Sequence, residues 1–127
     1  MAKKSYSKYN LKIIEALEKL PPTIEDKRHG FIISVEDDKS RSNETRFQHI
    51  AKSTHELKVR DIETIIEGIK NYVRFTKSKE LKDTYYYYIK RKGGNKGFIQ
   101  LAIKLKEGES KIYYIKTVFI AYKIKDY

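Results

Sequence analysis

The stretch TYYYYIKRKGGNKGFIQLAIKLKEGESKIYYIKTVFIAYKIK, residues 84–125, decides the fold of this chain. Aromatic and β-branched residues, which favour strands, concentrate in three segments of it, 84–91, 97–106 and 111–125. The two loops between these segments carry glycine, as hairpin connections commonly do. Together with the shorter apolar segment 72–76, the pattern predicts four consecutive strands in an antiparallel sheet.

The strand expected over 97–106 alternates in polarity and therefore has one packed face. Its apolar positions are Ile99, Leu101, Ile103 and Leu105. The positions between them, which would face solvent or a ligand, are Gln100, Ala102, Lys104 and Lys106. The segment 111–125 is apolar on both faces, which predicts a central strand.

Upstream of residue 70, apolar residues recur at steps of three and four, as on one face of a helix. Helices are expected over 9–20, after a cap at Asn43, and over about 60–70. The apolar stripe of the second helix is Phe47, Ile50, Ala51 and Thr54. The segment 31–35 fits either a strand or a buried extended leg. The expected fold class is α+β, with N-terminal helices packed on one face of a C-terminal four-stranded antiparallel sheet.

The composition bounds the class of protein. A length of 127 residues suits one domain, 1–127, around a single core. No run approaches the roughly 20 apolar residues that a membrane span requires, and no signal-like segment follows Met1. Cysteine is absent, which fits a reducing compartment, so a cytoplasmic protein without a membrane partner is expected.

The net charge of +11 is concentrated in the second half of the chain. Residues 1–69 hold 13 Lys and Arg against 12 Asp and Glu, whereas residues 70–127 hold 15 against 5. Such an excess favours phosphate-bearing partners through counterion release. The competing interpretation is a lysine-rich composition that reflects an AT-rich genome.

The run of four tyrosines at 85–88, followed by Ile89 and three cations, is the most unusual local feature. In a strand, Tyr86 and Tyr88 lie on one face, and Tyr85, Tyr87 and Arg91 lie on the other. Bases of single-stranded RNA can stack on rings while cations meet phosphates. The alternative is that tyrosine is a good strand residue and that one of the two faces belongs to the core.

Two of the three histidines, His49 and His55, flank Lys52 in the segment HIAKSTH. Six residues along a continuous helix place two side chains about 240° apart around its axis, so the two imidazoles converge only if the helix breaks near residues 53 and 54. Ser53 and Glu56 resemble a capping box that could cause such a break. Imidazoles titrate near neutral pH and could then act as base and acid at a phosphate. The alternative is that each histidine is a solvated helix-face residue.

Other kinds of site lack support in the sequence. Neither the spacing of His49 and His55 nor the pair Asp37-Asp38 gives a recognisable metal-ligand set, so no metal and no cofactor are expected. The loop 93–97 has neither the order nor the context of a phosphate-binding glycine loop. No serine stands in a nucleophile elbow.

The segments HIAKSTH, DIETIIEGI and YYIKTVFIAYKIK, in this order, resemble the barnase/EndoU/colicin/RelE-like nuclease superfamily, called the BECR fold. The resemblance is closest to the branch found in phages and mobile elements. It covers a nuclease-like core at residues 44–125, which leaves 1–43 as an N-terminal helix and extension. It implies a metal-independent endoribonuclease, in several cases a toxin, that forms a 2′,3′-cyclic phosphate.

The resemblance also implies roles for particular residues. His49 and His55 would transfer protons with Lys52 nearby, and Lys116 and Arg91 would balance charge on the phosphorane. Thr117 would bond a phosphate oxygen, and Tyr122 would stack a base or orient the scissile group. A regular strand sends Thr117 and Tyr122 to opposite faces, so their convergence requires a bulge or the end of a strand. The predicted RNA contacts are Lys52, Arg74, Tyr86, Tyr88 and Arg91.

Two further classes of function fit the same sequence. A module that binds RNA or DNA without cutting it would use the basic, tyrosine-rich sheet through counterion release and stacking. An interaction protein would dock its basic face on an acidic partner, such as an immunity protein or antitoxin. The target of the RNA-cleaving activity and the role of residues 1–43 are left open by the sequence.

Overall fold

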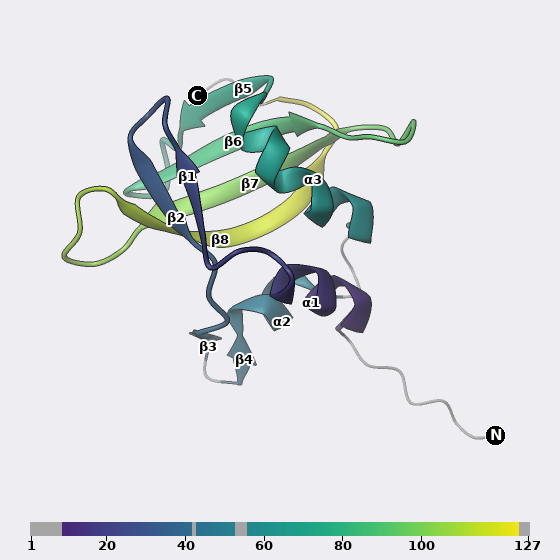
Figure 1. Cartoon of the computed structure of the whole chain (residues 1–127), viewed down its shortest axis with the longest axis horizontal. Coiled ribbons are helices and arrows are strands. Elements are labelled where there is room, and N and C mark those ends of the chain that lie inside the picture. Colours follow the sequence, from purple (N-terminus) through teal and green to yellow (C-terminus); the bar gives the residue numbers. More distant parts are fainter. Residues whose placement is uncertain (1–8, 42, 53–55, 125–127) are drawn as a thin grey trace.

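The computed structural model describes residues 9–41, 43–52 and 56–124, and for residues 40 and 41 it describes the backbone alone (Figure 1). Its helices are α1 (Leu11–Glu18), α2 (Arg46–Ile50) and α3 (Val59–Lys70). Its strands are β1 (Thr23–Asp26), β2 (Phe31–Ser34), β3 (Lys39–Arg41), β4 (Glu44–Thr45), β5 (Arg74–Lys77), β6 (Thr84–Lys90), β7 (Phe98–Leu105) and β8 (Ile112–Ala121). In this part of the chain, no helix combines the length and apolar character needed to cross a bilayer.

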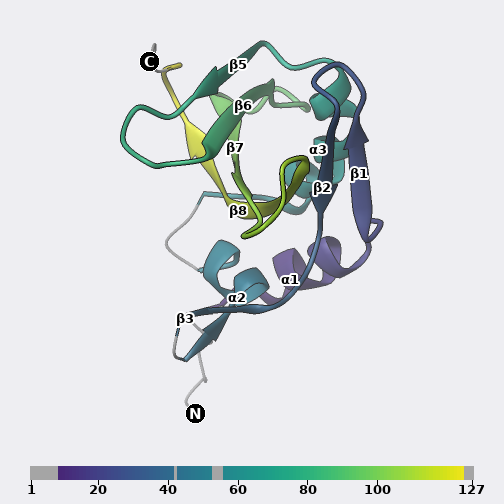
Figure 2. The same ribbon diagram turned by 90° about the vertical axis from the view of Figure 1, so that its left-hand side faces the viewer.

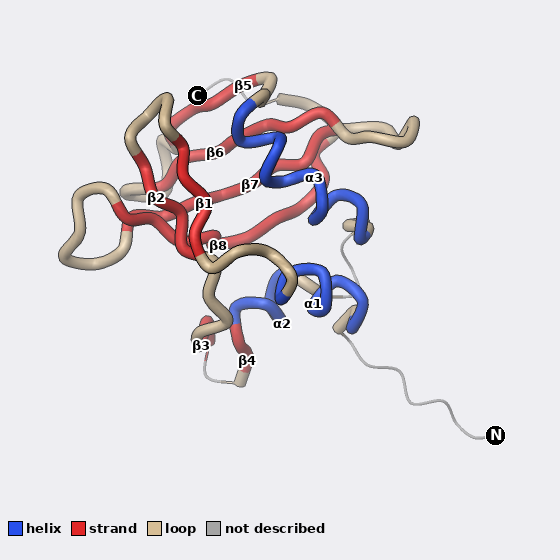
Figure 3. The backbone as a smooth tube through the Cα atoms, viewed as in Figure 1, coloured by secondary structure: helices blue, strands red, loops and turns tan. Residues whose placement is uncertain are grey.

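The main sheet has the strand order β1-β2-β8-β7-β6-β5 (Figure 3). The prediction of an α+β fold is confirmed, and the four strands expected after residue 70 are β5 to β8, paired antiparallel in chain order. The predicted extent of the sheet was wrong, because β1 and β2 enlarge it to six strands and β2 pairs parallel with β8. Strand β1 has Ile24 as its only aliphatic residue, too weak a pattern to predict a strand.

The second helix begins later than expected. Thr45, not Asn43, is the N-cap of α2, and its side chain and that of Gln48 form a reciprocal capping box. Asn43 instead precedes β4, which pairs with β3. The helix ends at Ile50, so His49 lies in its last turn. The predicted break at residues 53 and 54, and His55 itself, lie outside the described residues.

The main core fills the concave side of the curled sheet, where α3 lies (Figure 2). Isoleucines of α3 meet apolar side chains of β6, β7 and β8 there. The contact between α3 and β6 is close, because a Cβ on Gly68 would come within 2.4 Å of Ile89 Cγ2. A side chain at this helix position would therefore push α3 away from the sheet.

The convex side of the sheet carries a second, smaller apolar cluster. Its buried members are Tyr86, Tyr88 and Ala102, and Phe98, Ala121 and Ile124 pack against them. The predicted division of the tyrosines between two faces is therefore correct, since Tyr87 belongs to the main core. Both faces of β6 are nevertheless covered.

The β1–β2 hairpin is fastened to β6 by a buried carboxylate. Asp26 accepts a hydrogen bond from the Tyr87 hydroxyl, and His29 Nδ1 lies 2.8 Å from Asp26 Oδ2. The His29 ring stacks on Phe75 of β5, with 3.9 Å between centroids. Burial raises the pKa of Asp26, but the hydrogen bonds from Tyr87 and His29 outweigh burial and hold it below its ordinary value of 3.8.

Replacing Asp26 by asparagine should lower the free energy of unfolding at pH 7 by about 1–3 kcal/mol, because Tyr87 and His29 lose a charged partner. The depressed pKa means that Asp26 stabilises the fold above pH 3.8 and loses this effect as the pH falls through its folded-state pKa. Urea unfolding at pH 7 and at pH 3 should therefore show a smaller difference between wild type and Asp26→Asn at the lower pH. A pH-independent difference would contradict this role, and Glu25→Gln on the exposed face of β1 is the control.

Candidate active site

The short helix α2 lies against β8 and presents one flank to solvent. Phe47 and Ile50 are buried, which fixes the rotation of the helix. Arg46 and His49 are three residues apart, so their side chains project from the same flank. The His49 side chain is 22% exposed, which leaves part of the imidazole accessible.

Glu44, at the start of β4, binds His49 and two neighbouring side chains through its carboxylate. Its carboxylate, whose side chain is 8% exposed, lies 3.4 Å from His49 Nδ1 and 3.3 Å from Lys52 Nζ. The Tyr9 hydroxyl donates to the same carboxylate at 3.1 Å. Burial raises the pKa of Glu44, but the bonds from Lys52, Tyr9 and His49 outweigh burial and hold it below its usual range. A carboxylate at Nδ1 orients the imidazole so that Nε2 can exchange a proton with a substrate.

A β-bulge in β8 brings two predicted site residues to the convex face. The register runs from Ala102 opposite Thr117 to Ile103 opposite Ile115, so Lys116 is the extra residue. Ile115 and Val118 point into the main core. Thr117 consequently faces the convex side with Ala102, and Lys116 lies beside Lys104 of β7 on that side.

Three cations gather around this bulge. Burial lowers the pKa of Lys116, and the positive charges of Lys104 and Arg46 lower it further. Arg46 lies over the ring of Tyr114, with 4.3 Å between Cζ and the ring centroid, and its Nε donates to Asp38 at 2.9 Å. Like charges this close repel one another, and an anion bound among them would relieve the repulsion.

The α2–β8 surface consists of Arg46, His49, Lys104, Lys116 and Thr117. The structure thus brings three of the predicted catalytic residues, His49, Lys116 and Thr117, to neighbouring elements. Tyr122 is not among them, because it lies beyond the end of β8 and its hydroxyl donates to Glu56. Five residues of extended chain separate it from Thr117 by roughly 16 Å.

The predicted RNA contacts occupy different environments. Tyr86 and Tyr88 are 7% and 0% exposed, so neither offers a ring face on which a base could stack in this conformation. Arg91 is 7% exposed and forms a two-bond ion pair with Asp61, so its predicted contact with phosphate stays a prediction that competes with this pair. Arg74 of β5 lies opposite Tyr88 and is partly exposed. Lys52 is bound to Glu44.

Sequence reasoning missed Glu44, Arg46 and Lys104 as parts of this site. Glu44 and Arg46 flank the true N-cap Thr45, and the misplaced cap at Asn43 concealed their relation to His49. Lys104 was predicted to face solvent or a ligand, but its proximity to Lys116 depends on a bulge that no local sequence signal marks.

Comparisons with protein-family models, curated proteins and solved structures found no match for this chain. Within the described residues, no group of three or more histidine, aspartate and glutamate side chains is arranged to hold a metal ion.

Proposed function

We propose that this protein is an endoribonuclease that cleaves RNA without a metal ion, leaving a 2′,3′-cyclic phosphate and a free 5′-hydroxyl. The observation that carries the proposal is the pairing of His49 with the buried carboxylate of Glu44. His49 projects from the flank of α2 that also bears Arg46. Arg46 belongs to the cation group around the bulge of β8. A histidine that can accept a proton therefore shares one flank of α2 with a cation of the group that can hold a phosphate.

In the proposed reaction, His49 takes the proton of the ribose 2′-hydroxyl as its oxygen attacks the adjacent phosphorus. The bond from phosphorus to the 5′-oxygen breaks, and a second group returns a proton to that oxygen; His55 and Lys52 are the candidates. Lys116, Lys104 and Arg46 balance the charge that develops on the phosphate oxygens. The Thr117 hydroxyl donates to one of these oxygens.

Helices α2 and α3, followed by the antiparallel strands β5 to β8, fit the order of elements that the resemblance to the BECR fold implies, and β1 and β2 extend the sheet beyond it. In this proposal, residues 44–125 form the nuclease core, and the protein acts in the cytoplasm as a toxin or as a nuclease of a phage or mobile element. An acidic immunity protein or antitoxin would then restrain it.

The second candidate function is binding of RNA or DNA without cleavage, which the net charge of +11 and the three clustered cations favour. The two functions separate when a 5′-labelled single-stranded RNA is incubated with the protein and EDTA. A denaturing gel that shows shortened RNA supports cleavage. Intact RNA on that gel, together with a shift on a native gel, supports the binding module.

The double variant Lys104→Gln, Lys116→Gln should bind RNA more weakly than wild type, and its binding should depend less steeply on salt concentration. The slope of log K against log salt should fall by about 0.7 for each phosphate of a single strand that the variant no longer binds. Titrations of labelled RNA at several salt concentrations give this slope. A matched Lys79→Gln, Lys82→Gln variant removes two exposed cations from the β5–β6 loop, and an equal change in slope for both variants would contradict a specific phosphate site.

A further inference from the structure

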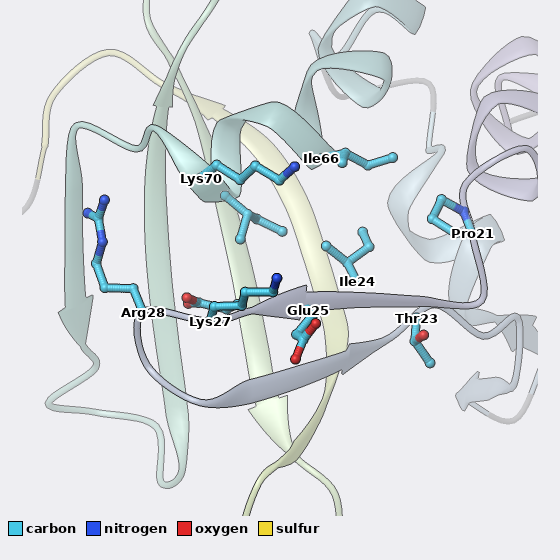
Figure 4. Close-up of a pocket in the computed structure, with 10 residues that line it drawn as sticks. Pro21, Thr23, Ile24, Glu25, Lys27, Arg28, Ile66 and Lys70 are labelled. Carbon is cyan, nitrogen blue, oxygen red and sulfur yellow. The ribbon is translucent and has the colours of Figure 1, made fainter.

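A pocket of about 520 Å³ lies between β1 and the C-terminal half of α3, remote in sequence from the α2–β8 surface (Figure 4). Its apolar lining includes Ile24 of β1 and Ile66 and Ile69 of α3. Such a volume accommodates one or two side chains of a partner. Nothing in the proposed cleavage reaction uses this pocket.

The pocket follows the free edge of β1. All four residues of β1, Thr23–Asp26, line it, although alternate side chains of a strand point to opposite faces. A pocket lined by every successive residue must therefore run along the edge of the strand. Within the described chain, β1 pairs with β2 alone and ends the sheet on this side.

The backbone groups on this edge can be assigned from the ladder. Pro22 O accepts from Val35 N, and Ile32 N donates away from β1 to Lys111 O. Because pairing alternates along an antiparallel ladder, the N–H and C=O groups of Thr23 and Glu25 point away from β2, toward the free edge. An extended segment could pair with these groups and lengthen the sheet.

The charged residues that line the pocket carry a net positive charge. Lys27, Arg28 and Lys70 outnumber the carboxylates of Glu25 and Asp26, and Asp26 is already bonded to Tyr87 and His29. Arg28 lies over the ring of Tyr72 with 5.1 Å between Cζ and the centroid. Figure 4 shows Glu25 on the opposite side of the β1 ribbon from Lys70. A segment that carries acidic side chains beside an apolar one would match both the rim and the floor.

We propose that the β1 edge binds an extended acidic segment of another protein, which adds to the sheet as a seventh strand and inserts an apolar side chain between β1 and α3. A second copy of this chain is a poor occupant because each copy carries a net charge of +11. The N-terminal residues 1–8 have three lysines and no acidic residue, so their charge also opposes the rim. RNA fits less well, because isoleucines offer no ring for stacking and the open groups are those of a peptide ladder.

The test uses ¹⁵N-labelled full-length protein and three synthetic eight-residue probes. These are an alternating Glu-Val peptide, an alternating Lys-Val peptide and octaglutamate. The Glu-Val peptide should shift the amide resonances of β1 and of the C-terminal half of α3, and should bind at least about tenfold more tightly than either other probe. Comparable binding of the Lys-Val peptide, or shifts confined to other elements, would overturn the proposal.

Substitution at the edge separates strand addition from general attraction of charge. Glu25→Pro removes the N–H that faces the free edge and spares the hydrogen bonds between β1 and β2. Edge strands tolerate proline at such a position, where the missing N–H is not part of the ladder. It should weaken the Glu-Val peptide about threefold to tenfold, the effect of one lost hydrogen bond. Glu25→Gln, which keeps the N–H, should not weaken binding. Equal affinities for the two variants would overturn strand addition.

Two further outcomes are decisive. Lys70→Glu should weaken the Glu-Val peptide, whereas Lys82→Glu, in the β5–β6 loop, should do so by less than twofold. If a single-stranded RNA shifts the β1 amides and the Glu-Val peptide does not, the surface belongs to nucleic acid and the proposal fails. Because the experiment measures peptide binding, its result tests the proposed strand addition independently of the proposed RNA cleavage.

Discussion

Replacing Arg91 by methionine should lower the free energy of unfolding by about 3–5 kcal/mol, the usual cost of removing one partner from a buried ion pair. Arg91 Nε and Nη2 donate to the two carboxylate oxygens of Asp61, each at 2.9 Å. Asp61 also accepts from Lys58 N at the start of α3. Methionine would leave the Asp61 charge buried without its guanidinium and would loosen the junction between α3 and β6.

Urea unfolding of Arg91→Met beside wild type measures this loss. Lys92→Met is the matched control, because Lys92 pairs with Glu67 on the surface and should cost about 0–1 kcal/mol. The double variant Asp61→Leu, Arg91→Met removes both charges and should recover part of the stability. A loss below about 1 kcal/mol for Arg91→Met would contradict the structural role given to this pair.

Replacing His49 by alanine should reduce the rate of RNA cleavage by about 100-fold or more, the typical contribution of a general base or acid. The side chain is partly exposed and its loss opens no core cavity, so the variant should fold normally. Single-turnover rates with saturating protein separate the chemical step from RNA binding. Thermal unfolding of the same samples checks the fold.

Glu44→Gln should give a smaller loss of cleavage rate than His49→Ala, because glutamine keeps the shape of the partner and removes only its charge. His29→Ala is the histidine control, since His29 lies in the β1–β2 hairpin and contacts Asp26. Cleavage by this control should stay within about threefold of wild type at a temperature where it is folded. If His49→Ala keeps the wild-type rate, the α2–β8 surface is not the active site.

The sequence predicted those parts of the fold that rest on strong local patterns. The isoleucines of α3 and the alternation in β7 located these elements to within one or two residues. The placement of Tyr86 and Tyr87 on opposite faces of the sheet was predicted from the two-residue alternation of side chains along a strand. Strand β1 was not predicted, because a four-residue edge strand with one buried aliphatic residue depends on tertiary pairing more than on its own composition.

The candidate site was predicted less completely than the fold, for a related reason. A basic residue in a sequence carries no sign of whether a carboxylate elsewhere in the chain binds it, as Asp61 binds Arg91. A tyrosine face suited to stacking bases is equally suited to a second core, and Phe98 and Ile124 complete that core here. His49, Lys116 and Thr117 were predicted, whereas Glu44 became visible only through its contacts.

The most direct test of RNA cleavage at the α2–β8 surface is to identify the ends of the RNA that the protein produces. An RNA oligonucleotide is incubated with wild-type protein and EDTA, and the products are weighed by mass spectrometry. We predict fragments that end in a 2′,3′-cyclic phosphate, whose rate of formation falls by about 100-fold or more with His49→Ala. These fragments should not form at a position where the RNA carries a 2′-deoxy sugar. Intact RNA, or cleavage at the 2′-deoxy position, would contradict the proposed activity.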